Sequence, residues 1–175
     1  GSDIPVYNSK IKIIDDPYAG EPVALVPAAH PDVAFIHVQR CDPLGNAQIL
    51  GHLGNDDSLA RAAHRVIITT EEIVPTEEIR RTPNLTYIPY YCVDAVVKVP
   101  FGAHGRGCAY YYSMDVPYGL QLQKVWSTEE GFNRWAEEWI YGVEDWSGYC
   151  RKLDWERLAR LAMVERRYQQ YGEVR

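Results

Sequence analysis

Three long apolar runs dominate the pattern of hydrophobic and polar positions along the chain. They cover residues 33–38, 65–70 and 93–99, and shorter apolar stretches at residues 11–14 and 23–26 precede them. Apolar side chains follow one another in the long runs instead of alternating with polar ones. This pattern is typical of strands that are covered on both faces. We therefore expect the three runs to form the centre of a parallel or mixed sheet.

A tight turn separates the first long run from a second, short apolar stretch. It reads Asp42, Pro43, Leu44, Gly45. Asp suits the first position of such a turn, Pro the second, and Gly a position with left-handed backbone. The segment therefore predicts a buried strand, a hairpin turn and a short returning strand.

Helical signals lie between the strands. Asp56, Asp57 and Ser58 predict the start of a helix that continues to about residue 64, because acidic side chains favour the positive end of a helix. A shorter helix is expected at residues 75–79.

The last third of the chain is predicted to be helical. Ser127 and Glu130 have the spacing of a capping box, which makes Ser127 the expected N-cap. Apolar residues then follow at helical spacing: Phe132, Trp135, Trp139 and Ile140. Asp145 predicts a helix to about residue 152, and Asp154 caps a final one. That helix lines one side with Leu158, Leu161, Ala162, Val164 and Tyr168.

These elements predict an α/β fold, with an open, mostly parallel sheet, flanking helices and a helical C-terminal tail. We expect residues 1–175 to form a single domain. The chain enters in short strands without an opening βαβ unit, and an open apolar sheet edge invites aggregation. We therefore expect an incomplete fold, which another chain or a missing N-terminal segment completes.

Composition narrows the classes of function. The formal net charge of -6 argues against a nucleic-acid binder, which would carry a basic face. There is no run of about 18 apolar residues to span a membrane, and the opening residues lack the apolar core of a signal peptide. We expect a cytoplasmic protein. Thirteen Tyr and five Trp, gathered in the second half, indicate either a protein interface or an ordinary core.

The four cysteines give no sign of a metal site. Cys41, Cys92, Cys108 and Cys150 have no CxxC spacing, and a zinc site needs closely spaced ligands. Free thiols in a cytoplasmic protein are the interpretation that we favour.

Polar side chains follow each of the three long apolar runs. Gln39 and Arg40 come after the first, residues 69–72 after the second, and His104 and Arg106 after the third. If the strands are parallel neighbours, these groups meet at one rim, where ligands of such sheets bind. Glycines flank the last pair, so backbone can approach a ligand closely there. An arginine suits a carboxylate or a phosphate.

Each of these residues also has a structural interpretation. Arg40 could brace the hairpin through Asp42, and Glu71 and Glu72 could cap a helix or face solvent. As neighbours on an extended chain, the two glutamates point in opposite directions and would not share a substrate. His104 could be a general acid or base or a structural residue. His37, inside an apolar run, is expected to be a core histidine with its hydrogen bonds satisfied.

Common catalytic signatures are missing from the sequence. It contains no GxSxG elbow, no P-loop and no GxGxxG after a strand. The GAHGRG stretch is rich in glycine but lacks the strand, turn and helix that hold a phosphate. Composition and spacing alone reach only an α/β domain with a polar rim.

Several long strings resemble the second half of the α subunit of glutaconate coenzyme A-transferase and its relatives, the family I CoA-transferases. The strings are DDPYAGEPVALVPAAHPDVAFIHVQRCDPLGNAQILG, RVIITTEEIV, VDAVVKVPFGAHG and FNRWAEEWIYGVEDWSGYCRKL. They occur in the order and spacing of that family and cover nearly the whole chain.

The resemblance implies one chain of an α/β heteromer that moves CoA between acyl-CoA thioesters and a carboxylic acid, glutaconate or a related one. A glutamate, usually on the β subunit, attacks the thioester and becomes a glutamyl-CoA intermediate, which splits one difficult transfer into easier steps. No catalytic residue is then expected in this chain. Gln39, Arg40, His104 and Arg106 are expected to bind substrate.

The same resemblance implies partners and substrates. The expected partners are the β subunit, acyl-CoA and possibly a separate N-terminal fragment of the α subunit; a nucleic acid, a membrane and a metal are not expected. CoA thioester enters as a substrate, and no tightly bound cofactor is expected.

Two departures from the family pattern keep other functions open. The longer N-terminal stretch of the family, with its Gly-rich loop, is absent. The residues from Phe101 to Arg106 replace a GGAHPS motif. Alternatives on the same scaffold are an acyl-CoA hydrolase that opens a ring C–C bond, a decarboxylase, and a noncatalytic structural subunit.

Overall fold

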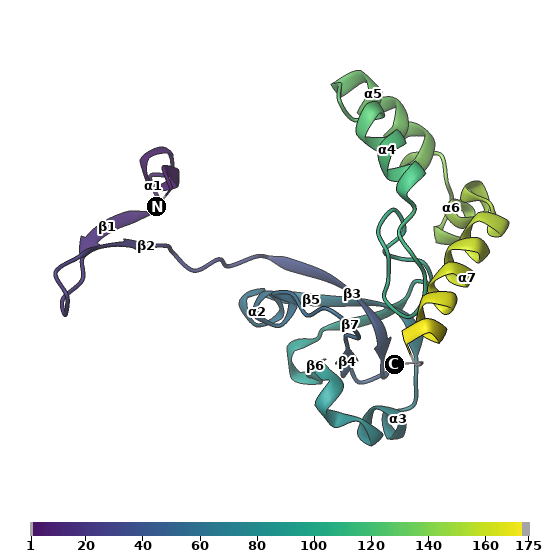
Figure 1. The fold of residues 1–175 in the computed structure, drawn as a ribbon, viewed down its shortest axis with the longest axis horizontal. Helices are drawn as coiled ribbons and strands as arrows, with labels where there is room; N and C mark the ends of the chain where they lie inside the picture. The colour runs from purple at the N-terminus through teal and green to yellow at the C-terminus, as the bar shows by residue number, and fades with distance from the viewer. Residues whose placement is uncertain (1, 173–175) are drawn as a thin grey trace.

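The central feature of the fold is a five-stranded mixed sheet (Figure 1). The computed structural model describes the backbone of residues 2–172 and the side chains of residues 2–163. The sheet has the strand order β6-β4-β3-β5-β7. Its strands are β3 (Val33–Cys41), β4 (Ala47–Gln48), β5 (Arg65–Ile73), β6 (Thr86–Ile88) and β7 (Ala95–Lys98). Strands β3, β5 and β7 are parallel, whereas β4 and β6 are antiparallel to their neighbours.

The apolar runs produce this sheet as predicted, but its two longest strands extend further than expected. The parallel ladder between β3 and β5 continues past the apolar residues, through Arg40 opposite Glu72 and Cys41 opposite Ile73. The polar residues that were expected to follow these two strands therefore lie within their last residues. Their backbone groups are paired in the ladder, which leaves only their side chains for other contacts.

One face of the sheet is packed and the other is partly open. Ala34, Ile36 and Ile68 are buried in a core that includes Ala60 of helix α2 (Asp56–Ala62). Successive side chains on a strand point to opposite faces. Phe35, on the other face, is 69% exposed. The described residues thus cover the sheet as expected on one face only.

The predicted hairpin joins β3 to β4. Asp42 Oδ1 accepts hydrogen bonds from the backbone N–H groups of Leu44 (3.0 Å) and Asn46 (2.8 Å). Gly45 has a φ of 106°, and a Cβ at this position would lie 2.8 Å from Val93 Cβ. Both the left-handed backbone and the close approach require glycine here.

The N-terminal residues form a separate small piece. It consists of α1 (Ile4–Tyr7) and the antiparallel pair β1 (Lys12–Asp15) and β2 (Pro22–Leu25). Figure 1 shows this piece projecting from the sheet on an extended connection. All eight residues of β1 and β2 are exposed, including Ile13, Ile14 and Leu25.

Five helical elements make up the C-terminal part of the chain. They are α4 (Val116–Val125), α5 (Glu129–Ala136), the π-helical turn η3 (Glu137–Tyr141), α6 (Trp146–Leu153) and α7 (Trp155–Gly172). Helices α4 and α5 project together, while α6 and α7 lie nearer the sheet (Figure 1). Tyr118, Cys150, Leu153 and Leu158 form a second buried cluster between them.

The capping predictions are right for two of three helices. Asp145 caps α6 through the Gly148 N–H (2.6 Å), and Asp154 accepts from the Glu156 N–H at the start of α7 (3.0 Å). The prediction for α5 is wrong by one residue, because Thr128 is its N-cap and accepts from Gly131 N–H. Val164 and Tyr168 of the predicted apolar side lie outside the residues whose side chains are described.

Three shorter helical elements connect the strands. Helix α3 (Thr76–Arg81) matches the short helix predicted there, and the 3₁₀ turns η1 (Pro83–Leu85) and η2 (Tyr90–Cys92) flank β6. Within the described residues, every helix is too short or too polar to cross a membrane.

Candidate active site

The carboxyl ends of the three parallel strands meet at one edge of the sheet, as predicted. The loop of residues 99–107, which follows β7, folds over this edge. Val99 N–H donates to the Thr70 carbonyl (2.8 Å), so the loop starts as an extension of the ladder with β5. The side chains beneath and beside the loop form the candidate site.

Glu71 lies under the loop and is 6% exposed. Its Oε1 accepts hydrogen bonds from His37 Nε2 (2.7 Å) and from the Tyr112 hydroxyl (2.8 Å). Its Oε2 accepts from the backbone N–H of Phe101 (2.7 Å). Burying a carboxylate is costly unless donors surround it, and here three donors do so. The interpretation of Glu71 as a helix cap or a solvent-facing residue is therefore wrong, whereas its neighbour Glu72 is exposed, as expected for opposite faces.

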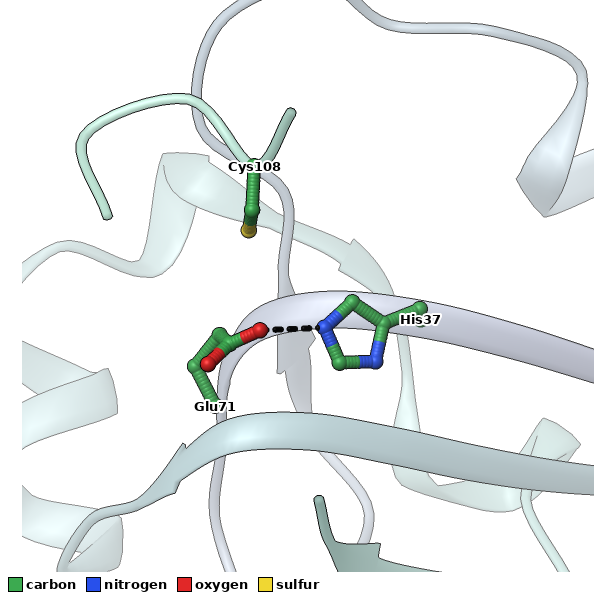
Figure 2. A group of neighbouring side chains, drawn as sticks. All are labelled: His37, Glu71 and Cys108. Atoms are coloured by element: carbon green, nitrogen blue, oxygen red, sulfur yellow. Dashed lines mark hydrogen bonds and ion pairs between the residues drawn. The ribbon is translucent and has the colours of Figure 1, made fainter. Parts of the chain in front are cut away.

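His37 is a histidine whose hydrogen bonds are satisfied, as predicted. Its Nδ1 lies 2.9 Å from Thr69 Oγ1, and its Nε2 faces Glu71 (Figure 2). The ring lies directly against the loop, since a Cβ on Gly102 would be 2.5 Å from His37 Cε1. His37 and Glu71 thus support the loop from beneath.

Cys108 completes a group of possible metal ligands at this place. Its sulfur, His37 nitrogen and Glu71 oxygen all lie within 4.8 Å of one another (Figure 2). Such donor atoms suit a zinc ion. However, Glu71 already accepts three hydrogen bonds from protein groups, and an ion would have to displace the hydrogen bond with His37. The charge of this carboxylate is balanced without a cation.

No disulfide joins the four cysteines, all of which lie in the described part of the chain. Burial and the nearby carboxylate of Asp42 raise the pKa of the Cys41 thiol to about 12. Since the thiolate is the reactive form, Cys41 belongs to the core and not to the chemistry of the site.

His104 is held in the interior by a charged network. Its side chain is 1% exposed, and Nε2 lies 3.1 Å from Asp115 Oδ2. Arg157 of α7 binds the same carboxylate through two hydrogen bonds of 2.6 and 2.9 Å. Burial lowers the pKa of His104, and the opposing effect of Asp115 does not overcome it. His104 is thus favoured in its neutral form, and it connects the loop to the helices.

Arg106 lies at the mouth of an apolar cavity of about 610 Å³. The cavity is lined by His104, Gly105, Arg106, Met114, Val116, Gly119, Leu120, Leu122, Gln123 and Trp126. Arg106 is exposed, and among the described residues its guanidinium has no hydrogen bond or ion pair. A free cation beside an apolar hollow can bind a carboxylate that carries a carbon chain.

Gln39 and Arg40 lie at a different part of the edge. Gln39 is buried and pairs with Leu50, donating to its carbonyl and accepting from its N–H, each at 3.0 Å. Arg40 donates to Gln48 (2.9 Å) and Glu78 (3.3 Å), so it braces the hairpin through these residues and not through Asp42.

Arg40 keeps one buried donor without a partner. Its Nε makes no hydrogen bond to the described residues. Arg40 also lines a separate cavity of about 460 Å³ with Leu50, Tyr87 and Tyr110. The four predicted residues therefore share the carboxyl edge of the sheet, but Arg40 and Arg106 line two different cavities.

Three further residues of the site were not found in the sequence: Tyr112, Asp115 and Arg157. Asp115 could have been found, because it precedes Val116 and Pro117 and caps α4 through Tyr118 N–H, and Pro is common in the first turn of a helix. Tyr112 and Arg157 act only through contacts with residues about 40 positions away, for which the sequence carries no local signal.

Comparison with known proteins settles the family. A family model described as coenzyme A transferase matches residues 4–99, more than half of the chain. The chain belongs to the coenzyme A transferase family. It is 42% identical to the α subunit of glutaconate CoA-transferase from Acidaminococcus fermentans, over 91% of this chain and 50% of that protein. The crystal structure of that enzyme matches with a TM-score of 0.82, over 87% of this chain and 48% of the other.

Two further relatives extend the range of functions in this family. The α subunit of 3-oxoadipate CoA-transferase from Pseudomonas knackmussii is 37% identical, over 87% of this chain and 54% of that protein. The IpdA subunit of a cholesterol ring-cleaving hydrolase from Mycobacterium tuberculosis is 29% identical, over 82% of this chain and 52% of that protein. The chain thus spans about half the length of these relatives.

Proposed function

We propose that this chain is part of the α subunit of a heteromeric CoA-transferase, which moves CoA from an acyl-CoA thioester to a carboxylic acid. The observation that carries the proposal is the similarity to glutaconate CoA-transferase, 42% identity together with a TM-score of 0.82. The acid is glutaconate or a related one. CoA thioester takes part as a substrate, with no tightly bound cofactor.

The nucleophile is a glutamate of the partner subunit. In this chain the buried glutamate of the site, Glu71, is poorly suited to attack a thioester. It is 6% exposed, and three hydrogen-bond donors stabilise its negative charge. A carboxylate held in this way is a weaker nucleophile, and a bulky thioester cannot reach it. The glutamyl-CoA intermediate of the proposed reaction forms on the other chain.

The contribution of this chain is a substrate-binding rim built from Gln39, Arg40, His104 and Arg106. Arg106 binds the carboxylate of the acid, whose carbon chain enters the adjoining apolar cavity. Arg40 offers its unpaired Nε to a second anionic group. Gln39 and His104, which are both enclosed by protein contacts, hold the two parts of the rim in place.

The assembled enzyme supplies the rest of the fold. An N-terminal α/β half, on the same chain or on a separate one, and a β subunit cover the surfaces that stay open here. These surfaces are apolar: Phe35 on the open sheet face, Leu25 and Ile13 on the N-terminal hairpin, and Leu120 on α4. Exposed apolar patches of this kind mark contacts with other chains.

The experiment that tests the proposal mixes the purified complex with an acyl-CoA and free acetate. Formation of acetyl-CoA, detected by mass spectrometry, supports transfer. Release of free CoA without acetyl-CoA would contradict it. That second result would favour a hydrolase, the alternative supported by the 29% identity to the ring-cleaving hydrolase subunit.

A further inference from the structure

The loop of residues 99–107 is anchored to a buried carboxylate that the proposed transfer does not use as a nucleophile. We infer that Glu71 is a positioning residue: it fixes this loop from beneath and thereby sets where Arg106 is held at the rim. The inference rests on the proposed function, in which Arg106 binds the acid.

Glu71 binds the loop at two backbone positions. Directly, its Oε2 accepts from the N–H of Phe101 (2.7 Å). Indirectly, its Oε1 accepts from the Tyr112 hydroxyl (2.8 Å), and that hydroxyl oxygen accepts from the N–H of Ala103 (2.9 Å). Two amides of the loop therefore depend on one side chain.

The second of these contacts leads to Arg106. The carbonyl of Ala103, in the residue whose N–H is held by Tyr112, accepts a hydrogen bond from the N–H of Arg106 (2.9 Å). The path from Glu71 through Tyr112 and Ala103 thus reaches the backbone of the residue that carries the free guanidinium. A shift at Glu71 would move that guanidinium relative to the cavity.

His37 fixes the orientation of the carboxylate and prevents the loop from settling lower. An ionised carboxylate only accepts hydrogen bonds, so His37 donates through Nε2, and its Nδ1 accepts from the Thr69 hydroxyl. The ring also leaves no room for a side chain on Gly102. Phe101, next to it, has a φ of 60°, which is disfavoured for a residue with a side chain. The bond from Phe101 to Glu71 holds this conformation.

A glutamine cannot replace Glu71 without losing a contact. Three donors converge on the two oxygens. Either orientation of a glutamine amide would place its NH₂ group against at least one of these donors. Glu71→Gln therefore breaks the network while it preserves the shape of the side chain.

The test uses the assembled enzyme with Glu71→Gln, and Glu72→Gln as the matched control. The control makes the same change of charge one residue along β5, on an exposed side chain, and glutamine can still accept the hydrogen bond from the Tyr111 hydroxyl. We expect Glu71→Gln to raise the KM for the acceptor acid about tenfold, the scale of one weakened charge-assisted contact. We expect the control to leave it unchanged.

Hydrogen–deuterium exchange separates positioning from a general loss of stability. In Glu71→Gln the amides of Phe101 and Ala103 should both exchange about tenfold faster. In Tyr112→Phe only the amide of Ala103 should do so, because the bond from Phe101 to Glu71 remains. This second, milder variant also carries the test if Glu71→Gln does not assemble.

A double variant shows whether the effect passes through Arg106. Arg106→Ala alone should raise the KM for the acid, and adding Glu71→Gln to it should change the KM by less than about twofold. Additive effects, or unchanged exchange in residues 101–103, would overturn the inference. A stoichiometric metal that is lost on Cys108→Ser would overturn it too, because Glu71 would then act as a ligand. Absence of transfer in the wild-type complex would contradict the proposed function, whereas the exchange measurement decides on the loop independently.

Discussion

Two buried carboxylates, Glu71 and Asp115, show how single residues hold charge inside this protein. Each is surrounded by donors from distant parts of the chain. Burial by itself raises the pKa of Asp115, but the hydrogen bonds from Arg157, His104 and the Tyr118 N–H outweigh it, and its pKa lies below the ordinary value. Removing one partner would leave a buried charge uncompensated, which is more costly than never having had the pair.

The neutral His104 leads to a prediction of pH dependence. Since burial lowers its pKa, the unfolded chain binds a proton more readily than the folded one. The contribution of His104 to stability is therefore complete above its unfolded pKa of about 6.5 and is lost as the pH falls. We expect the thermal midpoint of the assembled complex to fall between pH 7.5 and pH 5.5. The fall should be smaller in His104→Gln, as measured by differential scanning fluorimetry.

Asp115 acts in a different pH window. Its pKa is lowered, so its contribution is present above the unfolded value of about 4 and is lost only below it. If His104→Gln had the same pH profile as the wild type between pH 7.5 and pH 5.5, His104 would not be the group that titrates.

At the scale of elements, the site depends on how a loop and a group of helices pack on the ends of three strands. The loop of residues 99–107 is fixed to β5 by Glu71 and to α4, α6 and α7 by the contacts of His104 and Asp115. The two sides of the loop therefore belong to different packing units, and the loop joins the sheet core to the helical cluster.

Two glycines give opposite predictions at this scale. Gly102→Ala should lower stability by about 1–3 kcal/mol, the usual effect of overpacking, because the new Cβ would lie 2.5 Å from His37 Cε1. Gly119→Ala, inside α4 with nothing within 4 Å, should instead raise stability by about 0.5–1 kcal/mol, since alanine favours helix. Thermal midpoints of the two assembled variants check this. Equal shifts in one direction would contradict the packing around Gly102.

At the scale of the whole molecule, the chain leaves large apolar surfaces open. The sheet is covered on one face, the N-terminal hairpin stands apart, and α4 and α5 project from the rest (Figure 1). The relatives are about twice as long as this chain. These observations agree with an assembly in which other segments complete the sheet and bury the hairpin.

We therefore expect the chain expressed alone to aggregate. Its open sheet face and strand edges would pair with other copies in the absence of a partner. Coexpression with the N-terminal half and the partner subunit should give a soluble complex. Size-exclusion chromatography with light scattering is the measurement, and a monodisperse monomer that unfolds cooperatively would contradict the expectation.

Local sequence patterns determined most of the secondary structure. The hairpin at Asp42 was predictable because turn preferences act within four residues, and the long strands because their apolar runs are continuous. Helix α4 was missed, because Pro117 and Gly119 argue against a helix and the cap at Asp115 is the sole local signal for it. The cap of α5 was placed at Ser127 and not at Thr128, because both side chains can serve as caps and the choice depends on how the chain enters the helix.

The roles of the site residues were decided by the tertiary structure. The sequence by itself determined the family resemblance, the α/β class and the meeting of polar groups at one edge of the sheet. It could not show that Glu71 is buried under a loop 30 residues further along, or that His104 is enclosed by Asp115 and Arg157. The physical reason is that helix, strand and turn preferences act between near neighbours. The partners of a buried charge are chosen by packing between segments that are far apart in the chain.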